Sequence, residues 1–291
     1  MYIYINGDIK EAGSARLSVF EHGFMYGLGL FETFRIYNGH PFLLDDHFFR
    51  LERGLSVMGI DWVYHRENVQ QQLNELLAAN KLKHAYVRYN VSAGEGELGL
   101  TTAPYKNSNT IIYMKPLPDP ATSLEQAKNG KLLTVRRNSP ESEERLKSHH
   151  YLNNILGKRE TGADQSVEGL YLNEKGYLTE GVVSNLFWVK GTTIYTPAVE
   201  TGILNGITRA FIINLAKKLS FYVREGQFKI KMLYDADEAF VTNSIQEIVR
   251  LNAVDDHYFT AGHSVVDKLQ QEYKRYREQL WSISEMKRKE D

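Results

Sequence analysis

The chain contains no cysteine, no excess of either charge and no long apolar run. Without cysteine it cannot form disulfides, thiolate nucleophiles, iron–sulfur clusters or cysteine-ligated zinc sites. Its 35 basic and 36 acidic side chains give a formal net charge of -1, so general attraction to nucleic-acid phosphates is missing. No stretch approaches the ~18 apolar residues that a membrane-spanning helix needs, and residues 1–8 lack the features of a signal peptide. We therefore expect a cytoplasmic protein that contacts neither nucleic acid nor membrane.

What is present indicates a folded protein of two domains. Hydrophobic residues make up 42% and charged residues 24% of the 291 positions, which is ordinary for a globular protein. Single hydrophobic cores stop growing at roughly 250–300 residues, so this length favours two domains. Three of the seven prolines fall within 116–120, and proline at this density ends both helices and strands. We expect a domain at 1–115, a proline-rich linker at 116–123 and a domain at 124–291.

Both expected domains mix strands and helices, which predicts an α/β fold of the α+β type. In the first domain, 30–37 is β-branched and aromatic and ends at an Asn-Gly turn, so it predicts a strand. Apolar residues at helical spacing predict helices that contain Leu51 to Met58 and Val69 to Leu77, and 85–93 and 110–114 have strand character. In the second domain we expect strands near 131–137, 167–173, 182–189, 192–196 and 237–242, and helices near 148–161, 207–219 and 264–284.

Two common kinds of site lack support in the sequence. Residues 94–99 match the dinucleotide pattern G-x-G-x-x-G after an expected strand, but no amphipathic helix follows and the loop holds two carboxylates. We interpret this segment as a flexible loop. The nine histidines show no spacing typical of a metal site, so we expect no metal.

Lys147 is the first candidate for chemistry. It precedes the helix expected near 148–161, where the helix dipole and neighbouring Arg145 would favour a neutral amine. A neutral lysine can form a Schiff base with an aldehyde cofactor and can then move a proton. The alternative is an ordinary surface lysine.

Other segments offer partners for a pyridine ring and a phosphate. Glu180 begins a largely apolar stretch, and a buried carboxylate there would suit a protonated pyridine nitrogen; the alternative is a surface turn. Backbone N–H groups at Ile207 and Thr208, where a helix is expected to begin, would suit a phosphate. Asn243 and Ser244 would form a second such helix start, or a plain capping box with Glu247. Arg50 would add a cation, or pair with Asp46.

In combination these motifs resemble the fold-type IV pyridoxal-phosphate enzymes, which comprise branched-chain aminotransferases, D-amino-acid aminotransferases and aminodeoxychorismate lyases. The resemblance covers nearly the whole chain, from Asn6-Gly7 to the helix that begins near Ser264. The motifs that carry it are Phe-Glu-Thr at 31–33, His-x-x-Arg-Leu at 47–51, Lys147, Glu-Gly with Ser-Asn-Leu-Phe at 180–187, Gly-Ile-Thr-Arg at 206–209 and Thr-Asn-Ser at 242–244.

The resemblance implies a smaller N-terminal α+β domain, a larger strand-rich pseudo-barrel domain, a homodimer and a site between the domains. It also implies that pyridoxal 5'-phosphate is the cofactor, with Lys147 as its Schiff-base lysine and Glu180 as the partner of its pyridine nitrogen. Arg50, Ser244 and the backbone at Ile207 and Thr208 would bind its phosphate. Tyr151 would contact its phenolic oxygen, and Asn243 would lie beside it.

Within the family, the stretches at 31–35, 146–154 and 184–188 look most like the aminodeoxychorismate lyases. The expected reaction converts 4-amino-4-deoxychorismate into 4-aminobenzoate, a folate precursor, and pyruvate. Lys147 would remove the ring proton, and Thr33 would donate a proton to the leaving group. Four basic residues are candidates for binding the two substrate carboxylates, namely Arg88, Arg137, His149 and His150.

Three alternatives remain open at this point. A branched-chain aminotransferase usually has Gly-Glu-Asn where this chain has Val183-Ser184-Asn185. A D-amino-acid aminotransferase carries Arg-x-His in the loop after the strand at 85–93, and 94–99 contain neither residue. A binding protein without chemistry would need neither Lys147 nor Glu180.

Overall fold

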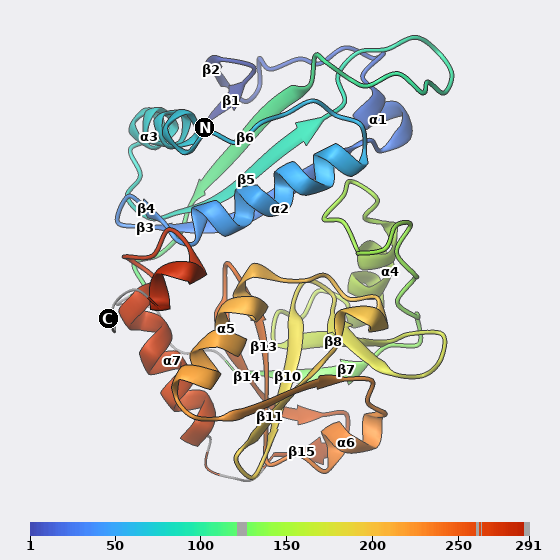
Figure 1. The fold of residues 1–291 in the computed structure, drawn as a ribbon, viewed down its shortest axis with the longest axis vertical. Helices are drawn as coiled ribbons and strands as arrows, with labels where there is room; N and C mark the ends of the chain where they lie inside the picture. The colour runs from blue at the N-terminus through green and yellow to red at the C-terminus, as the bar shows by residue number, and fades with distance from the viewer. Residues whose placement is uncertain (121–126, 260–261, 263, 288–291) are drawn as a thin grey trace. The chain divides into compact units, whose positions relative to one another are not determined.

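The computed structural model describes residues 1–120, 127–259, 262 and 264–287, and the chain forms two compact units within it (Figure 1). Unit 1 comprises Met1–Ser123, Lys147–His150 and Arg277–Asp291, and unit 2 comprises Leu124–Leu146 and Tyr151–Tyr276. The division at 123/124 adjoins the expected linker, whose last three residues lie outside the described part. Both units are discontinuous in the sequence, so the single cut that we expected is wrong.

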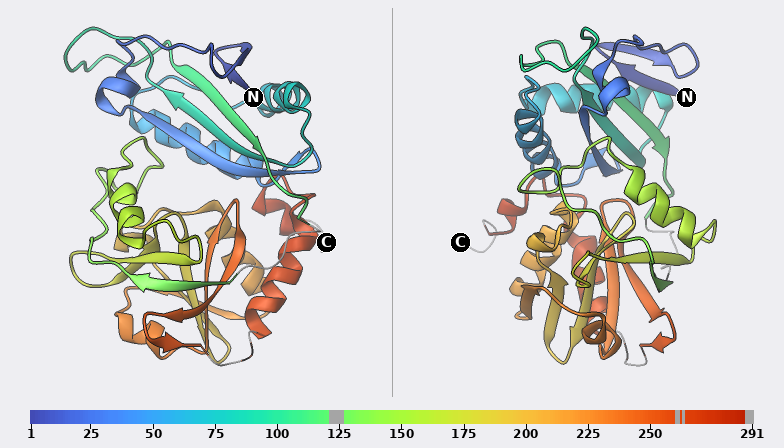
Figure 2. Two further views of the ribbon diagram at one scale, coloured as in Figure 1. Left: turned by 180° about the vertical axis from the view of Figure 1, so that it is seen from behind. Right: turned by 90° about the vertical axis from the view of Figure 1, so that its right-hand side faces the viewer.

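Unit 1 is built on a six-stranded sheet with the order β2-β1-β6-β5-β3-β4. Helices α2 and α3 pack on this sheet, as Figure 1 and the rotated views of Figure 2 show. The elements are β1 (Tyr2–Ile5), β2 (Asp8–Glu11), α1 (His22–Tyr26), β3 (Gly29–Tyr37), β4 (His40–Pro41), α2 (Leu44–Val57), α3 (Arg66–Asn80), β5 (Ala85–Ser92), β6 (Asn109–Pro116) and the 3₁₀ turn η2 (Ile283–Lys287). The strands and helices expected in this half are confirmed.

The two faces of this sheet have different surroundings. Neighbouring residues along β3 point to opposite faces, and residues directly opposite on β5 share a face. Phe34 contacts the ring of Phe48 on α2, with ring centroids 6.0 Å apart, so this face is covered by helices. Phe31 and Thr33 therefore belong to the other face, together with Arg88, which is in register with Thr33.

Unit 2 contains a closed barrel. Its strands run in the order β10-β13-β14-β7-β8-β9, and β9 pairs again with β10, which closes the ring. Strands β11 and β12 extend the sheet beyond β10, and β15 pairs with β14. This closure confirms the strand-rich pseudo-barrel that the family resemblance implies. Leu170, Leu186, Trp188, Val241 and Leu251 belong to the buried apolar cluster of this unit.

The elements of unit 2 are β7 (Ala127–Leu132), α4 (Leu152–Thr161), β8 (Val167–Leu172), β9 (Leu178–Gly181), β10 (Asn185–Lys190), β11 (Thr193–Pro197), η1 (Val199–Thr201), α5 (Ile207–Lys218), β12 (Tyr222–Gly226), α6 (Ile230–Tyr234), β13 (Glu238–Asn243), β14 (Glu247–Val254), β15 (His257–Tyr258) and α7 (Ser264–Tyr276). Strands β9, β12, β14 and β15 and helix α6 were not expected, and the helix expected at 264–284 ends at Tyr276. The strand expected at 131–137 lies at 127–132, because β7 pairs with β14 on one side and β8 on the other.

Two further expectations concern loops and membranes. Residues 100–108 are irregular, so the glycine-rich loop at 94–99 is not followed by the helix that a dinucleotide motif requires. None of the helices in the described ranges is long and apolar enough to cross a bilayer.

Candidate functional site

Lys147 lies on a short extended segment that adds to the edge of β3. The backbone N–H of Phe31 donates to the carbonyl of Lys147 at 3.0 Å, and the N–H of His149 donates to the carbonyl of Gly29 at 3.0 Å. Helix α4 begins only at Leu152, with Tyr151 as its N-cap. The expectation that Lys147 adjoins the start of a helix is therefore wrong, because strand pairing within unit 1 holds the segment extended.

Three basic side chains surround the ring of Phe31 on the face of the sheet that α2 does not cover. The guanidinium carbon of Arg88 lies 3.6 Å from the ring centroid, and Nζ of Lys147 lies 4.7 Å from it. The imidazole of His149 stacks on the same ring with centroids 6.3 Å apart. Of the four basic residues predicted to bind substrate carboxylates, two thus lie beside the same aromatic ring as Lys147.

The imidazole of His149 is tightly enclosed, and its pKa is lowered. Burial, together with the positive charge of Arg88, lowers the pKa of its imidazole to about 4, so the ring is neutral at pH 7. Its Nε2 is buried and has no hydrogen-bond partner within the described part of the chain. A Cβ at Gly29 would lie 2.5 Å from the ring, so only glycine at this position leaves space for it. His150 is exposed, and its Nε2 lies 3.3 Å from the carbonyl oxygen of Tyr26.

Arg50 is bound to Glu32 on the helix-covered face of the sheet. Its Nε and Nη2 donate to the two carboxylate oxygens at 2.8 and 2.7 Å, and His47 contacts the same carboxylate at 2.7 Å. Burial raises the pKa of Glu32, but the charges of Arg50 and His47 and the hydrogen bonds from both together outweigh burial, and the pKa falls to about 2. Two of the motifs quoted above, at 31–33 and 47–51, are therefore parts of one buried cluster.

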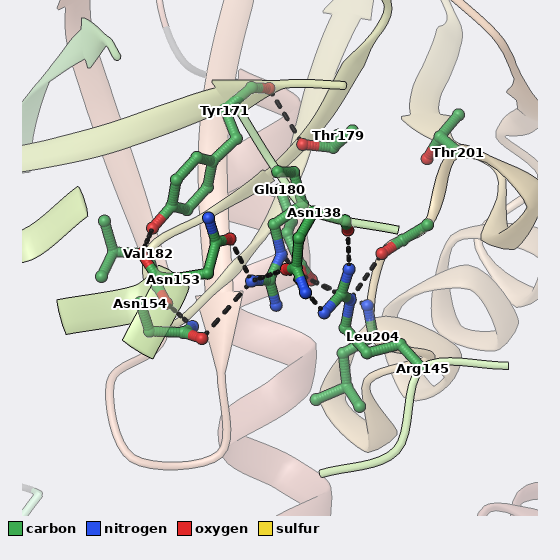
Figure 3. Close-up of polar contacts among 12 residues, drawn as sticks. Asn138, Arg145, Asn153, Asn154, Tyr171, Thr179, Glu180, Val182, Thr201 and Leu204 are labelled. Atoms are coloured by element: carbon green, nitrogen blue, oxygen red, sulfur yellow. Dashed lines mark hydrogen bonds and ion pairs between the residues drawn. The ribbon is translucent and has the colours of Figure 1, made fainter. Parts of the chain in front are cut away.

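Glu180 is buried at the end of β9 and is held from three sides (Figure 3). Its Oε1 accepts from Nε of Arg137 at 2.8 Å, and its Oε2 accepts from the backbone N–H of Leu204 at 2.9 Å. Asn185 also donates to Oε2 at 3.4 Å and to the carbonyl of Leu204 at 2.9 Å. The carboxylate is thus fixed in orientation, and the alternative of an exposed surface turn is wrong.

Arg137 has a different role from the one expected. It is 5% exposed, and besides Glu180 its guanidinium contacts Asn153 at 2.6 Å and Asn154 at 3.4 Å. These contacts direct the positive charge toward Glu180, so the prediction that Arg137 binds a substrate carboxylate is replaced by a role in holding Glu180.

Three of the predicted phosphate-binding residues, Ile207, Thr208 and Ser244, meet at the start of α5. This helix begins at Ile207 as expected, and its N-cap, Gly206, supplies no side-chain bond to the first turn. The hydroxyls of Thr208 and Ser244 lie 3.0 Å apart. Backbone N–H groups at a helix start together with two hydroxyl groups form a donor set that suits a phosphate.

Ser244 itself lies in the hairpin turn between β13, which ends at Asn243, and its antiparallel neighbour β14, which begins at Glu247. The expected second helix start at 242–247 is therefore wrong. Asn243 uses its Oδ1 to accept from the backbone N–H groups of Ile245 and Gln246 at 3.0 and 2.8 Å. Its side chain shapes the turn that presents Ser244, and its contact with the cofactor stays a prediction.

The donor set fits pyridoxal phosphate. An oriented buried carboxylate suits the pyridine nitrogen, and the start of α5 with Thr208 and Ser244 suits the phosphate. These groups lie in unit 2, as does Tyr151, whose contact with the phenolic oxygen stays a prediction. Lys147 and Arg50 lie in unit 1.

The sequence did not reveal which residues hold the site groups in place, because these partners are far away along the chain. Arg137 is 43 positions from Glu180, and Glu32 is 18 positions from Arg50. A buried carboxylate needs a cationic partner, so the sequence indicated that such a partner exists but not which residue it is. Asn185, in contrast, lies in a motif already quoted and could have been assigned.

Comparisons with known proteins agree with this arrangement. Residues 29–254 match the family model described as "Amino-transferase class IV". The chain is 44% identical over 276 residues to the aminodeoxychorismate lyase of Bacillus subtilis (strain 168), covering 94% of each chain. Among solved structures, the branched-chain amino acid aminotransferase of Escherichia coli has a TM-score of 0.85 at 28% identity, with 95% of this chain and 94% of that chain covered. The branched-chain amino acid aminotransferase of Thermoproteus uzoniensis, solved with norvaline, has a TM-score of 0.83 at 27% identity, with 94% of each chain covered.

Proposed function

Because the chain belongs to the class IV aminotransferase family, whose members use pyridoxal phosphate, we propose that it converts 4-amino-4-deoxychorismate into 4-aminobenzoate and pyruvate. The observation that carries this proposal is the 44% identity to an aminodeoxychorismate lyase over 94% of both chains. The homodimer expected from the family and the cytoplasmic location expected from the composition accompany the proposal as expectations.

The cofactor supplies an aldehyde that binds an amine and a protonated pyridine ring that accepts electrons. In our proposal Lys147 holds the aldehyde carbon, and Glu180 keeps the pyridine nitrogen protonated. Arg50, Thr208, Ser244 and the backbone N–H of Ile207 hold the phosphate. Because Arg137, Asn185 and the Leu204 N–H fix the Glu180 carboxylate, it keeps one orientation toward the ring nitrogen.

Once the substrate amine had taken its place at the cofactor, the freed amine of Lys147 would take the proton from the amine-bearing ring carbon. The ring C–O bond to the enolpyruvyl group would break as the ring becomes aromatic, and the released enolpyruvate would tautomerise to pyruvate. Thr33 is in register with Arg88 on the face that bears the Phe31 ring, and we assign it the proton donated to the leaving group. Thr33 is half-buried.

The two substrate carboxylates need positive or hydrogen-bonding partners. Arg88 is the permanent cation beside Lys147, so we rank it first among the candidates. Neutral His149 would donate a hydrogen bond rather than a charge. His150 ranks below both because it is exposed.

An assay without any keto acid tests this proposal. The purified protein is incubated with 4-amino-4-deoxychorismate alone, and 4-aminobenzoate and pyruvate are quantified. We expect equal amounts of both products over many turnovers. If neither product forms, while D-alanine or leucine bleaches the cofactor absorbance, the protein is an aminotransferase and the lyase proposal is wrong. The likeness to the Escherichia coli branched-chain enzyme makes that the alternative to test first.

A further inference from the structure

A buried ion pair in unit 2 takes no part in the chemistry described above. Lys128 on β7 donates from Nζ to Oε2 of Glu168 on β8 at 2.8 Å, and the two side chains are 9% and 4% exposed. Burying two charges is costly unless their remaining hydrogen-bonding positions are also filled. The partners that fill these positions are therefore informative.

Both charged groups have a second partner, and each partner lies in a turn next to a cofactor-binding group. Oε1 of Glu168 accepts from the hydroxyl of Ser184 at 2.7 Å. Ser184 lies in the turn between β9 and β10, which joins Glu180 to Asn185. On the other side, Nζ of Lys128 donates to Oε1 of Gln246 at 3.2 Å. Gln246 lies in the turn between β13 and β14 that contains Ser244.

The backbone beside this pair is adapted to it. A Cβ at Gly181 would lie 2.2 Å from the Ser184 hydroxyl and 2.6 Å from Oε1 of Glu168. The residue after Glu180 must therefore be glycine for the Glu168–Ser184 bond to form. At the other end, Asn243 donates to the same Gln246 oxygen at 3.2 Å, which joins the chain of bonds to the turn around Ser244.

We propose that Lys128 and Glu168 are a positioning pair for the cofactor. The chain of contacts Ser184–Glu168–Lys128–Gln246 ties the turn beside the pyridine-binding carboxylate to the turn beside the phosphate-binding hydroxyl. The pair itself touches neither group. It fixes the spacing of the two turns, and the affinity for pyridoxal phosphate depends on that spacing. This inference rests on the cofactor contacts proposed for Glu180 and Ser244.

Measuring the affinity for pyridoxal phosphate distinguishes a positioning role of the Lys128–Glu168 pair from a purely structural role. The full-length protein is purified with its cofactor, resolved from it and titrated with pyridoxal phosphate, and the thermal midpoint is measured with and without cofactor. We expect Glu168→Gln to raise the dissociation constant about tenfold or more, the scale on which groups behind a binding site act, and to shift the absorbance maximum of the bound cofactor. Ser184→Ala, which removes one bond and no charge, should raise the dissociation constant less.

Glu238→Gln is the matched control. Glu238 is also a buried carboxylate on a barrel strand, but it accepts from the backbone N–H groups of Val265 and Val266 at 3.1 and 3.0 Å. This variant should lower the thermal midpoint of the cofactor-free protein while leaving the dissociation constant unchanged. If it raises the dissociation constant as much as Glu168→Gln does, the effect is general destabilisation and our inference is wrong.

Two more variants complete the test. Lys128→Met/Glu168→Met leaves no unpaired buried charge, so it replaces the single variant should that one fail to fold. If the double variant and Ser184→Ala both bind the cofactor with the wild-type dissociation constant and spectrum, the positioning role is refuted. Glu180→Gln is the reference. An unchanged spectrum in Glu180→Gln would overturn the proposed cofactor contact itself, which is a different failure from that of the pair.

Discussion

Arg137 donates from Nε to Oε1 of Glu180 at 2.8 Å, and both side chains are 5% exposed. The two residues come from segments 43 positions apart, so local sequence gives no indication that they meet. Removing one partner of such a buried pair leaves the other charge without compensation.

We expect Arg137→Gln to lower the free energy of unfolding by about 3–5 kcal/mol and to change the absorbance of the bound cofactor. Chemical denaturation and absorbance spectra measure the two effects. The control is Arg275→Gln, because Arg275 is 65% exposed in its pair with Glu272 and should contribute at most about 1 kcal/mol. Equal losses in the two variants would contradict the importance of the buried pair.

Lys147→Ala should abolish the absorbance of the cofactor–lysine bond and reduce turnover by at least about 10²–10⁴-fold, the range attributed to a positioned acid–base group. Spectra of the purified variant and product assays check both results. Lys10→Ala, at an exposed position on β2, serves as the control and should behave as the wild type. Retained turnover in Lys147→Ala would remove this lysine from the mechanism.

Thr33 allows a comparison of two nearly isosteric changes. Thr33→Val deletes the hydroxyl, and we expect slower pyruvate release with unchanged cofactor affinity, because Thr33 touches the leaving group and not the cofactor in our proposal. Thr33→Ser keeps the hydroxyl and should retain most of the activity. Product assays and cofactor titrations distinguish the two variants, and equal activity of both would refute the proton-donor role.

Stability should depend on pH through Glu32. Its folded pKa is about 2 against an ordinary value of 4.5, so its stabilising contribution is complete above pH 4.5 and is lost as the pH falls toward 2. The shift corresponds to at most about 3 kcal/mol. Urea denaturation at several pH values should show a shallower acid loss for Glu32→Gln than for the wild type. Identical slopes would show that the pKa of Glu32 is not lowered in the folded protein.

His149 should remain neutral through the physiological range. Because its folded pKa is about 4 and its ordinary value is 6.5, the unfolded chain binds a proton first as the pH falls. Stability is therefore lost between pH 6.5 and 4. Imidazole titration by nuclear magnetic resonance tests this directly. Arg88→Gln should raise the pKa of His149, since it removes a nearby positive charge, and an unchanged pKa would exclude that cause.

Residue type and spacing along the chain predicted several individual strands and helices correctly. The strand β3 and the helices α2, α3 and α5 follow from residue type and spacing, and so does the start of α5 at Ile207. The closed barrel came from the family resemblance instead, since strand closure is a property of residues far apart. Lys147, Glu180 and the phosphate-binding groups were candidates from residue type alone, and the resemblance gave them their roles at one cofactor.

The errors arose where long-range pairing overrides a local signal. Ser244 with Glu247 fits a capping box, yet β14 pairs with β13 and makes the segment a hairpin turn. The helical spacing after Lys147 is real, but pairing with β3 keeps 147–149 extended and delays the helix to Leu152. The exposed side chains of Leu152 and Ile155 show that this spacing did not indicate a buried face.

Protein synthesis adds a consequence of the discontinuous units. Unit 1 needs Lys147–His150 beside β3 and residues 277–287 in addition to its first 123 residues. The ribosome makes Lys147–His150 after only the first segment of unit 2, Leu124–Leu146, but it makes residues 277–287 after the whole of unit 2. Unit 1 therefore cannot be completed before unit 2 has been translated, and the edge of β3 that receives the Lys147 segment is synthesised more than a hundred residues before that segment.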